Sequence, residues 1–158
     1  MSIFTWKRLV GVLAVLLVLA GGYYAWMMMP GGALTGTTAV APMDWGGTPV
    51  PNVVELETNP AKPYSVKIWV VPLGANLYVH AGTNRAQWVV YLENDDAARM
   101  LMDERLYDLS ATRVTDAAEF AAFSDAYQIR YGRRPRNEDV NEAYLFRLSP
   151  RDGELEVN

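Results

Sequence analysis

One long apolar stretch lies near the start of the chain. No charged side chain occurs between Arg8 and Asp44, and the segment Leu9–Met29 is almost wholly apolar. A helix needs about 20 such residues to cross the hydrocarbon core of a bilayer. Trp6 precedes the segment and Trp26 lies near its end, as in the aromatic belts at membrane interfaces. We therefore predict a transmembrane anchor at residues 9–29.

The charges beside this segment predict its orientation. Lys7 and Arg8 place residues 1–8 in the cytoplasm by the positive-inside rule. We expect a single-pass protein of the bacterial inner membrane with a periplasmic C-terminal domain. In the alternative reading, Val18-Leu19-Ala20 is a signal-peptide cleavage site. We favour a retained anchor, because the apolar run exceeds the usual signal-peptide core of roughly 7–15 residues.

Residues 30–52 are rich in Gly, Pro and Thr and show no sustained period, so we predict a linker there. Short apolar segments separated by turn residues follow. They predict six strands, at Val53–Thr58, Ser65–Leu73, Leu77–Ala81, Ala97–Met102, Arg105–Thr115 and Ala143–Leu148. Both faces of Ser65–Leu73 are largely apolar, so we expect this strand to be buried on both sides. Residues 152–158 form an acidic tail.

Two segments between the strands have helical spacing. In Asn84–Asn94, Trp88, Tyr91 and Leu92 fall on one face. Thr115-Asp116 with Glu119 is typical of a helix start, and Gly132 of a helix end. Between them lies an aromatic stripe that predicts a core face: Phe120, Phe123, Tyr127 and Tyr131. Residues 53–151 are therefore predicted to form a small antiparallel barrel of the α+β class, with about six strands and two helices.

The segments LYVHAG, RVTDAAEFAAFSDAYQIRYG and AYLFRL, in this order within Val53–Arg151, resemble the pyridoxamine-5′-phosphate-oxidase-like split β-barrel superfamily. They are most similar to its branch of flavin- and deazaflavin-dependent nitroreductase relatives. The resemblance implies a homodimer that binds FMN, deazaflavin or haem between its subunits. Many relatives carry Trp-x-Arg-Asn-Leu where this chain has Trp88-Val89-Val90-Tyr91-Leu92, so a guanidinium that could hold a phosphate is replaced.

Composition excludes several kinds of chemistry. The chain has no Cys and one His, which excludes thiolate chemistry and a three-histidine zinc site. Its formal charge of −4 disfavours nucleic-acid binding, and no metal site is predicted. The region after residue 8 is more acidic still, because Lys7 and Arg8 lie before it.

Six residues are candidate cofactor ligands, and each has a structural alternative. Thr83 and Arg85 could hold an anion at a helix start, or serve as an ordinary cap and a solvated cation. Lys67 and Trp69 share a strand face and could offer a cation and a stacking ring, or only pack. His80 could bind haem iron or move a proton, or make a structural hydrogen bond. The set comprises Lys67, Trp69, His80, Thr83, Arg85 and Trp88.

The run Arg130–Arg136 (RYGRRPR) is locally basic. Cations at a helix end stabilise the helix dipole, and the same run could bind an anion or an acidic partner.

Two functions remain open. The first is a non-catalytic accessory or assembly subunit of a membrane complex, in contact with lipid and with a membrane protein or a second copy through Leu9–Met29. The second is a flavin- or deazaflavin-dependent oxidoreductase. We favour the first, because no acid–base residue stands out and the phosphate-holding position is replaced.

Overall fold

The computed structural model describes residues 3–82 and 85–151, and within its first helix the side chains of residues 10–22. The chain divides into two compact units, Met1–Pro30 and Gly31–Asn158. The first unit holds one helix, α1 (Ile3–Met28), whose apolar side chains between residues 10 and 19 are exposed. Within the described residues, no helix reaches the length and apolar character that a membrane crossing requires.

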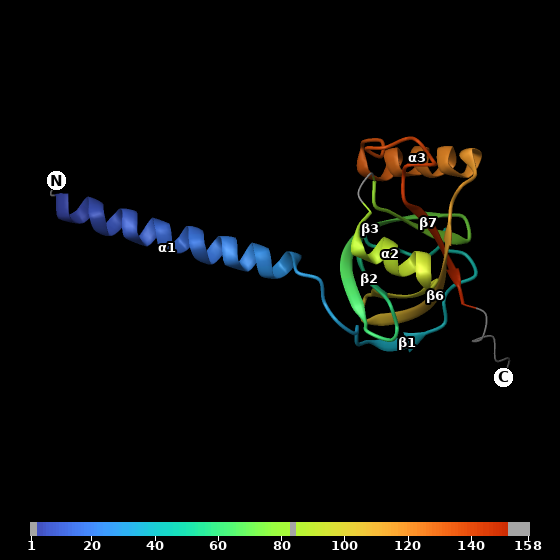
Figure 1. Cartoon of the computed structure of the whole chain (residues 1–158), viewed down its shortest axis with the longest axis horizontal. Helices are drawn as coiled ribbons and strands as arrows, with labels where there is room; N and C mark the ends of the chain where they lie inside the picture. Colours follow the sequence, from blue (N-terminus) through green and yellow to red (C-terminus); the bar gives the residue numbers. More distant parts are fainter. Residues whose placement is uncertain (1–2, 83–84, 152–158) are drawn as a thin grey trace. The chain divides into compact units, whose positions relative to one another are not determined.

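The second unit is built on one seven-stranded sheet, of which six strands close into a barrel (Figure 1). These strands are β2 (Val53–Thr58), β3 (Tyr64–Leu73), β4 (Asn76–His80), β5 (Ala97–Met102), β6 (Arg105–Arg113) and β7 (Leu145–Pro150). Their order around the barrel is β2-β3-β4-β7-β6-β5, and β5 pairs with β2 to close it. Every ladder among the six is antiparallel. The predicted antiparallel α+β barrel is confirmed, and its topology is compatible with a split barrel.

Two tight turns set the register of the predicted hairpins. Leu73 pairs with Asn76, and Met102 pairs with Arg105, so each turn contains two residues. Asp103 and Glu104 have φ angles of 48° and 65°. Two successive positive φ angles are what a two-residue type I′ hairpin turn requires, because that turn matches the twist of the strands.

Apolar side chains fill the barrel interior. Alternate strand residues point inward, and Leu56, Val70 and Leu109 are completely buried there. Helix α2 (Gln87–Asn94) adds Trp88, Val89 and Leu92 to the same cluster. The inside of this barrel is therefore a packed core, as expected for a barrel of few strands.

Helix α3 (Ala117–Tyr131) covers the outside of β3, β4 and β7 (Figure 1). Its start and end are as predicted: the Asp116 side chain accepts a hydrogen bond from the Glu119 amide at 2.7 Å, and Gly132 has a φ of 72°. Only glycine adopts such a φ readily. The aromatic stripe forms a second cluster outside the barrel, the α3 cluster, with Val71, Tyr78, Val114, Phe120, Phe123, Tyr127, Ala143 and Leu145.

The predicted linker at residues 30–52 is wrong, because residues 31–52 belong to the barrel unit. The amide of Gly31 donates to Ser65 O at 2.8 Å, and β1 (Thr37–Ala39) pairs in parallel with β6. Trp45 is 1% exposed and packs edge-on against Tyr107 in the interior cluster. Residues 31–45, which we call the strap, thus cover the barrel and give the unit a seventh strand.

The expectation that β3 is buried on both faces holds only at one end of the strand. Val71 is buried under α3, whereas Lys67 and Trp69 on the same outer face are exposed. Helix α3 therefore covers only part of the outer face of this strand.

Candidate functional site

The candidate cofactor residues lie in three separate environments. Lys67 and Trp69 are on the outer face of β3, and His80 lies at the end of β4 beside α3. Trp88 is in the first turn of α2, and Arg85 precedes that helix. Thr83 lies outside the described residues.

Trp69 forms a stack with residues from the end of α3. Its ring lies 4.7 Å from the ring of Tyr131 at an interplanar angle of 19°. The guanidinium of Arg133 lies 4.7 Å from the centre of the same indole. Lys67 is exposed two residues away and is in register with Glu55 of β2. The indole of Trp69 therefore stacks on Tyr131 and has Arg133, rather than Lys67, as its neighbouring cation.

His80 is enclosed by aromatic rings. Its imidazole lies 5.7 Å from the ring of Phe123 and 6.5 Å from that of Tyr127. Its Nε2 is shielded from solvent and has no hydrogen-bond partner in the part of the chain that the structure describes. Burial, with a smaller contribution from the charge of Arg113, lowers the pKa of His80 to about 4. The imidazole is therefore neutral at neutral pH, and its shielded Nε2 is not open to an iron ion in this conformation.

The two residues near α2 have structural partners. The helix begins at Gln87 rather than at Asn84, so Arg85 precedes it and does not line its first turn. Arg85 instead donates to Glu93 Oε2 from Nε at 2.9 Å and from Nη2 at 2.5 Å. Trp88 is 5% exposed and packs against Phe146 inside the barrel. The predicted anion site at the start of this helix is therefore not formed by Arg85, and Trp88 is a core residue.

These positions do not fit a flavin site within one chain. A flavin phosphate needs cations that converge on one point. Arg85 is neutralised by Glu93, and Lys67 is opposite Glu55. The rings of Trp69 and His80 lie 6.1 Å and 6.5 Å from the ring of Tyr127. Trp88 is separate from them, because it belongs to the cluster inside the barrel.

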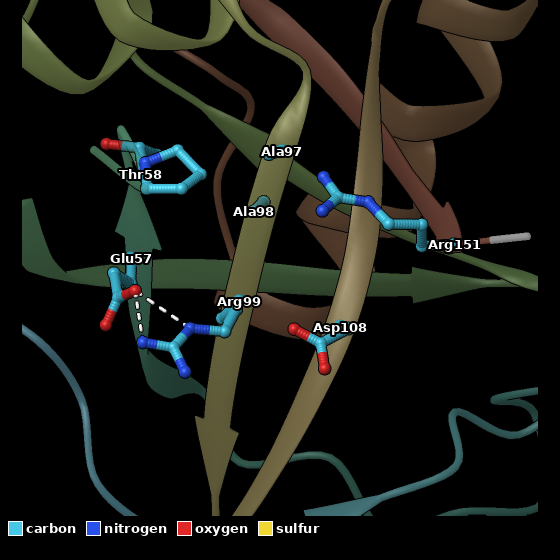
Figure 2. Close-up of a pocket in the computed structure, with 8 residues that line it drawn as sticks. Glu57, Thr58, Ala97, Ala98, Arg99, Asp108 and Arg151 are labelled. Atoms are coloured by element: carbon cyan, nitrogen blue, oxygen red, sulfur yellow. Dashed lines mark hydrogen bonds and ion pairs between the residues drawn. The ribbon is translucent and has the colours of Figure 1, made fainter. Parts of the chain in front are cut away.

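A second polar site lies under the strap and gave no local sequence signal. The carboxylate of Glu57 accepts hydrogen bonds from Arg99 Nε at 2.8 Å and Arg99 Nη2 at 2.5 Å (Figure 2). It also accepts one from the amide of Leu34. Glu57 is only 3% exposed. Because a buried carboxylate is costly unless it is paired and hydrogen-bonded, these three bonds fix the strap to β2 and β5.

Beside this ion pair is a cavity of about 240 Å³ on the outer face of the sheet (Figure 2). Charged side chains of both signs reach it: Glu57, Arg99, Asp108 and Arg151. Thr58, Pro60, Ala97 and Ala98 form the rest of its wall. A cavity of this size and mixed charge suits a small polar ligand, and it is below the range of roughly 300–1,000 Å³ for drug-sized ligands.

Metal coordination has no support from the side chains described. Among the described side chains, those of residues 10–22, 29–82 and 85–151, no three His, Asp or Glu lie close enough together to hold an ion.

The sequence matches no model of a known protein family, and no curated protein is significantly similar to it.

Proposed function

We propose that this protein is a membrane-anchored accessory or assembly subunit whose barrel acts through its outer surfaces and performs no catalysis. One observation supports this above all: the candidate cofactor residues are divided among an exposed stack, an enclosed imidazole and a packed core. The filled barrel interior agrees with it, because a ligand inside would have to displace close-packed side chains.

The anchor and its orientation are part of this proposal, and they rest on the sequence. The segment Leu9–Met29 is free of charged residues, and α1 covers it without a break up to Met28. A helix that is apolar all round needs an apolar environment, and its exposed side chains between residues 10 and 19 have none in the first unit. With Lys7 and Arg8 inside, the barrel lies in the periplasm of a bacterial cell.

Fractionation tests the anchor directly. We expect the full chain to stay in the membrane pellet after carbonate extraction, and external protease to digest the barrel in spheroplasts. A chain released by carbonate would contradict the anchor, and a protected barrel would contradict the orientation.

The stack at Trp69 favours a second candidate, a flavin- or deazaflavin-dependent oxidoreductase. A half-exposed indole beside Arg133 could bind a flat ring and a phosphate if a second copy completed the site. The cofactor would supply the redox chemistry, and the chain would supply binding and charge.

The visible spectrum of the detergent-purified full chain separates the two candidates. We expect no flavin or haem absorption, even after addition of FMN, deazaflavin or haemin. A flavin band or a haem Soret band near one equivalent per chain would contradict the non-catalytic proposal.

Copurification tests docking to a partner. We expect the full chain to elute with a larger membrane complex, and exchange of Leu9–Met29 for an unrelated apolar anchor to abolish this if the helix docks. Retention after the exchange would place docking on the barrel, and elution of the original chain alone would contradict an assembly role.

A further inference from the structure

The exposed stack belongs to a larger surface at the C-terminal end of α3. We call this the Trp69 surface, and it comprises Trp69, Tyr127, Arg130, Tyr131, Arg133 and Arg136. The ring of Tyr131 lies 4.7 Å from both the Trp69 ring and the Tyr127 ring. Trp69 remains 39% exposed in this arrangement, and Val53, its partner on β2, is 45% exposed. An aromatic and aliphatic patch therefore borders several arginines.

Hydrogen bonds to the backbone hold this surface in place. The Tyr131 hydroxyl lies 2.8 Å from Asn52 O and 2.7 Å from Val70 O. Arg130 Nη2 donates to Val50 O at 2.5 Å and to Pro51 O at 2.9 Å. A surface fixed in this way loses little conformational entropy when it binds.

Arg133 and Arg136 of the Trp69 surface keep their charge available, whereas the guanidinium of Arg130 is bound to the carbonyls of Val50 and Pro51. Within the described part of the chain, no carboxylate lies within 4.0 Å of the guanidinium groups of Arg130, Arg133 or Arg136, whereas Arg134 pairs with Asp125 and Glu138. Burial raises the pKa of the Tyr127 hydroxyl, and the charges of Arg133 and Arg136 oppose that effect, so both cations lie near this ring. The acidic residue Glu55 is in register with Lys67, which carries the opposite charge, across β2 and β3.

A second copy of the chain is a poor occupant for this surface. A two-fold interface would place the same arginines against one another, and like charges in contact are unfavourable. The chain as a whole has a formal charge of −4. A second copy could therefore offer acidic residues to these arginines only through a different patch of its surface. The occupant should therefore be anionic and should accept indole and phenol rings at its edge.

We propose that the Trp69 surface binds the anionic headgroups of a phospholipid bilayer. Arginine side chains bind phosphates, and Trp and Tyr rings are favoured at headgroup depth. This inference rests on the proposed anchor, because only Met29 and Pro30 separate the last residue of α1 from Gly31. An anchored chain therefore keeps the concentration of headgroups around the barrel high, so that a few cations suffice.

The absence of Cys from the chain allows a clean test with the full protein. A single Val53→Cys substitution places an environment-sensitive fluorophore beside Trp69, and Ala61→Cys places it in the exposed β2–β3 turn as a control. The protein is reconstituted into vesicles of phosphatidylcholine alone or with 30% phosphatidylglycerol. We expect quenching by nitroxide lipids at residue 53 only with phosphatidylglycerol, and we expect 1 M salt to remove it.

Charge-reversal variants test the arginines themselves. Arg133→Glu with Arg136→Glu should lower the ratio of bound to unbound barrel by at least about tenfold. Arg105→Glu with Lys62→Glu is the matched control, because it reverses the same number of charges at exposed residues outside the Trp69 surface. An equal loss with this control, or equal quenching in both lipid compositions, would overturn lipid recognition by this surface. A change in the fluorescence at residue 53 on addition of an acidic protein, without quenching in phosphatidylglycerol vesicles, would replace the bilayer with a protein partner.

Flotation of the same vesicles separates this inference from the proposed anchor. If the chain floats with both compositions but residue 53 is never quenched, the anchor stands and the Trp69 surface does not bind lipid. Flotation with phosphatidylglycerol alone would overturn the anchor and support the surface. Failure to float with either composition would overturn both.

Discussion

Two covers lie on the outside of the same barrel and are held by different forces. Helix α3 packs through aromatic side chains, and the few polar groups beneath it include the shielded Nε2 of His80. The strap buries Trp45 at its end, but elsewhere it is held by backbone pairing at Gly31 and β1 and by the buried Glu57–Arg99 ion pair. The stability of an apolar contact depends on close packing of the side chains. The stability of a buried ion pair depends on both charged partners being present. The two should therefore fail under different perturbations.

The largest effect is expected from Phe123→Ala in the α3 cluster. Phe123 is 1% exposed and contacts the rings of Tyr78, His80 and Tyr127. Its removal should lower the free energy of unfolding by about 3–5 kcal/mol. Hydrogen exchange should accelerate in α3 and stay slow in the strap. Ile129→Ala is the control, because Ile129 is 87% exposed on the same helix and should change stability by less than about 0.5 kcal/mol.

The second largest effect is expected from acid, which should weaken the packing of α3 on the barrel. The pKa of His80 is about 4 in the folded protein and 6.5 in an unperturbed histidine, so the unfolded state binds a proton first as the pH falls. The free energy of unfolding should therefore decrease from about pH 6.5 towards pH 4, by at most about 3 kcal/mol. Denaturant titrations between pH 7 and pH 5 measure this slope. His80→Gln should flatten it, and an unchanged slope would show that other groups cause the loss.

Glu57→Gln should loosen the strap instead. The substitution removes the charge that accepts two hydrogen bonds from Arg99 and leaves that guanidinium partly buried. Because Arg99 is about one-third exposed, we expect a loss of about 2 kcal/mol, below the usual cost of breaking a fully buried pair. Hydrogen exchange of the backbone amides of Leu34 and β1 should accelerate, while exchange in α3 should not change. Glu55→Gln, two residues away and without a hydrogen bond to Arg99, should be nearly neutral.

The smallest effect concerns the start of α3. Asp116→Ala removes the bond to the Glu119 amide and should lower the free energy of unfolding by about 1 kcal/mol. Thermal melts of this variant and of Asp116→Asn, which keeps a capping oxygen, measure the contribution. Equal losses in both variants would argue for a charge effect at the helix dipole rather than for the hydrogen bond.

The sequence predicted the barrel well because its strands carry local boundaries. Asn59-Pro60 follows β2, and Asp103-Glu104 forms the turn between β5 and β6. The ends of β2 and β5 and the start of β6 therefore lie at the predicted residues. Strand β1 was missed because Thr37–Ala39 has no alternation of its own and is a strand only through pairing with β6.

The functional surfaces were harder to predict because they join distant segments. Glu55 and Glu57 look alike in the sequence of β2, yet only Glu57 is covered, since the strap brings the Leu34 amide to it. Trp69 was identified as a candidate stacking residue, but its partners Tyr131 and Arg133 lie far along the chain, at the end of α3 and just after it. The sequence showed the residue types, and only the packing of α3 on β3 brings them together.

Strand β6 has a further consequence for the behaviour of this protein in a crowded cell. Along one edge it pairs with β1 at residues 105–107 and then with β7 at residues 109–113. Without the strap, the first of these stretches would present free amides and carbonyls, which are a template for strand addition by another chain. By pairing with residues 105–107, the three residues of β1 remove this template from the surface of the barrel.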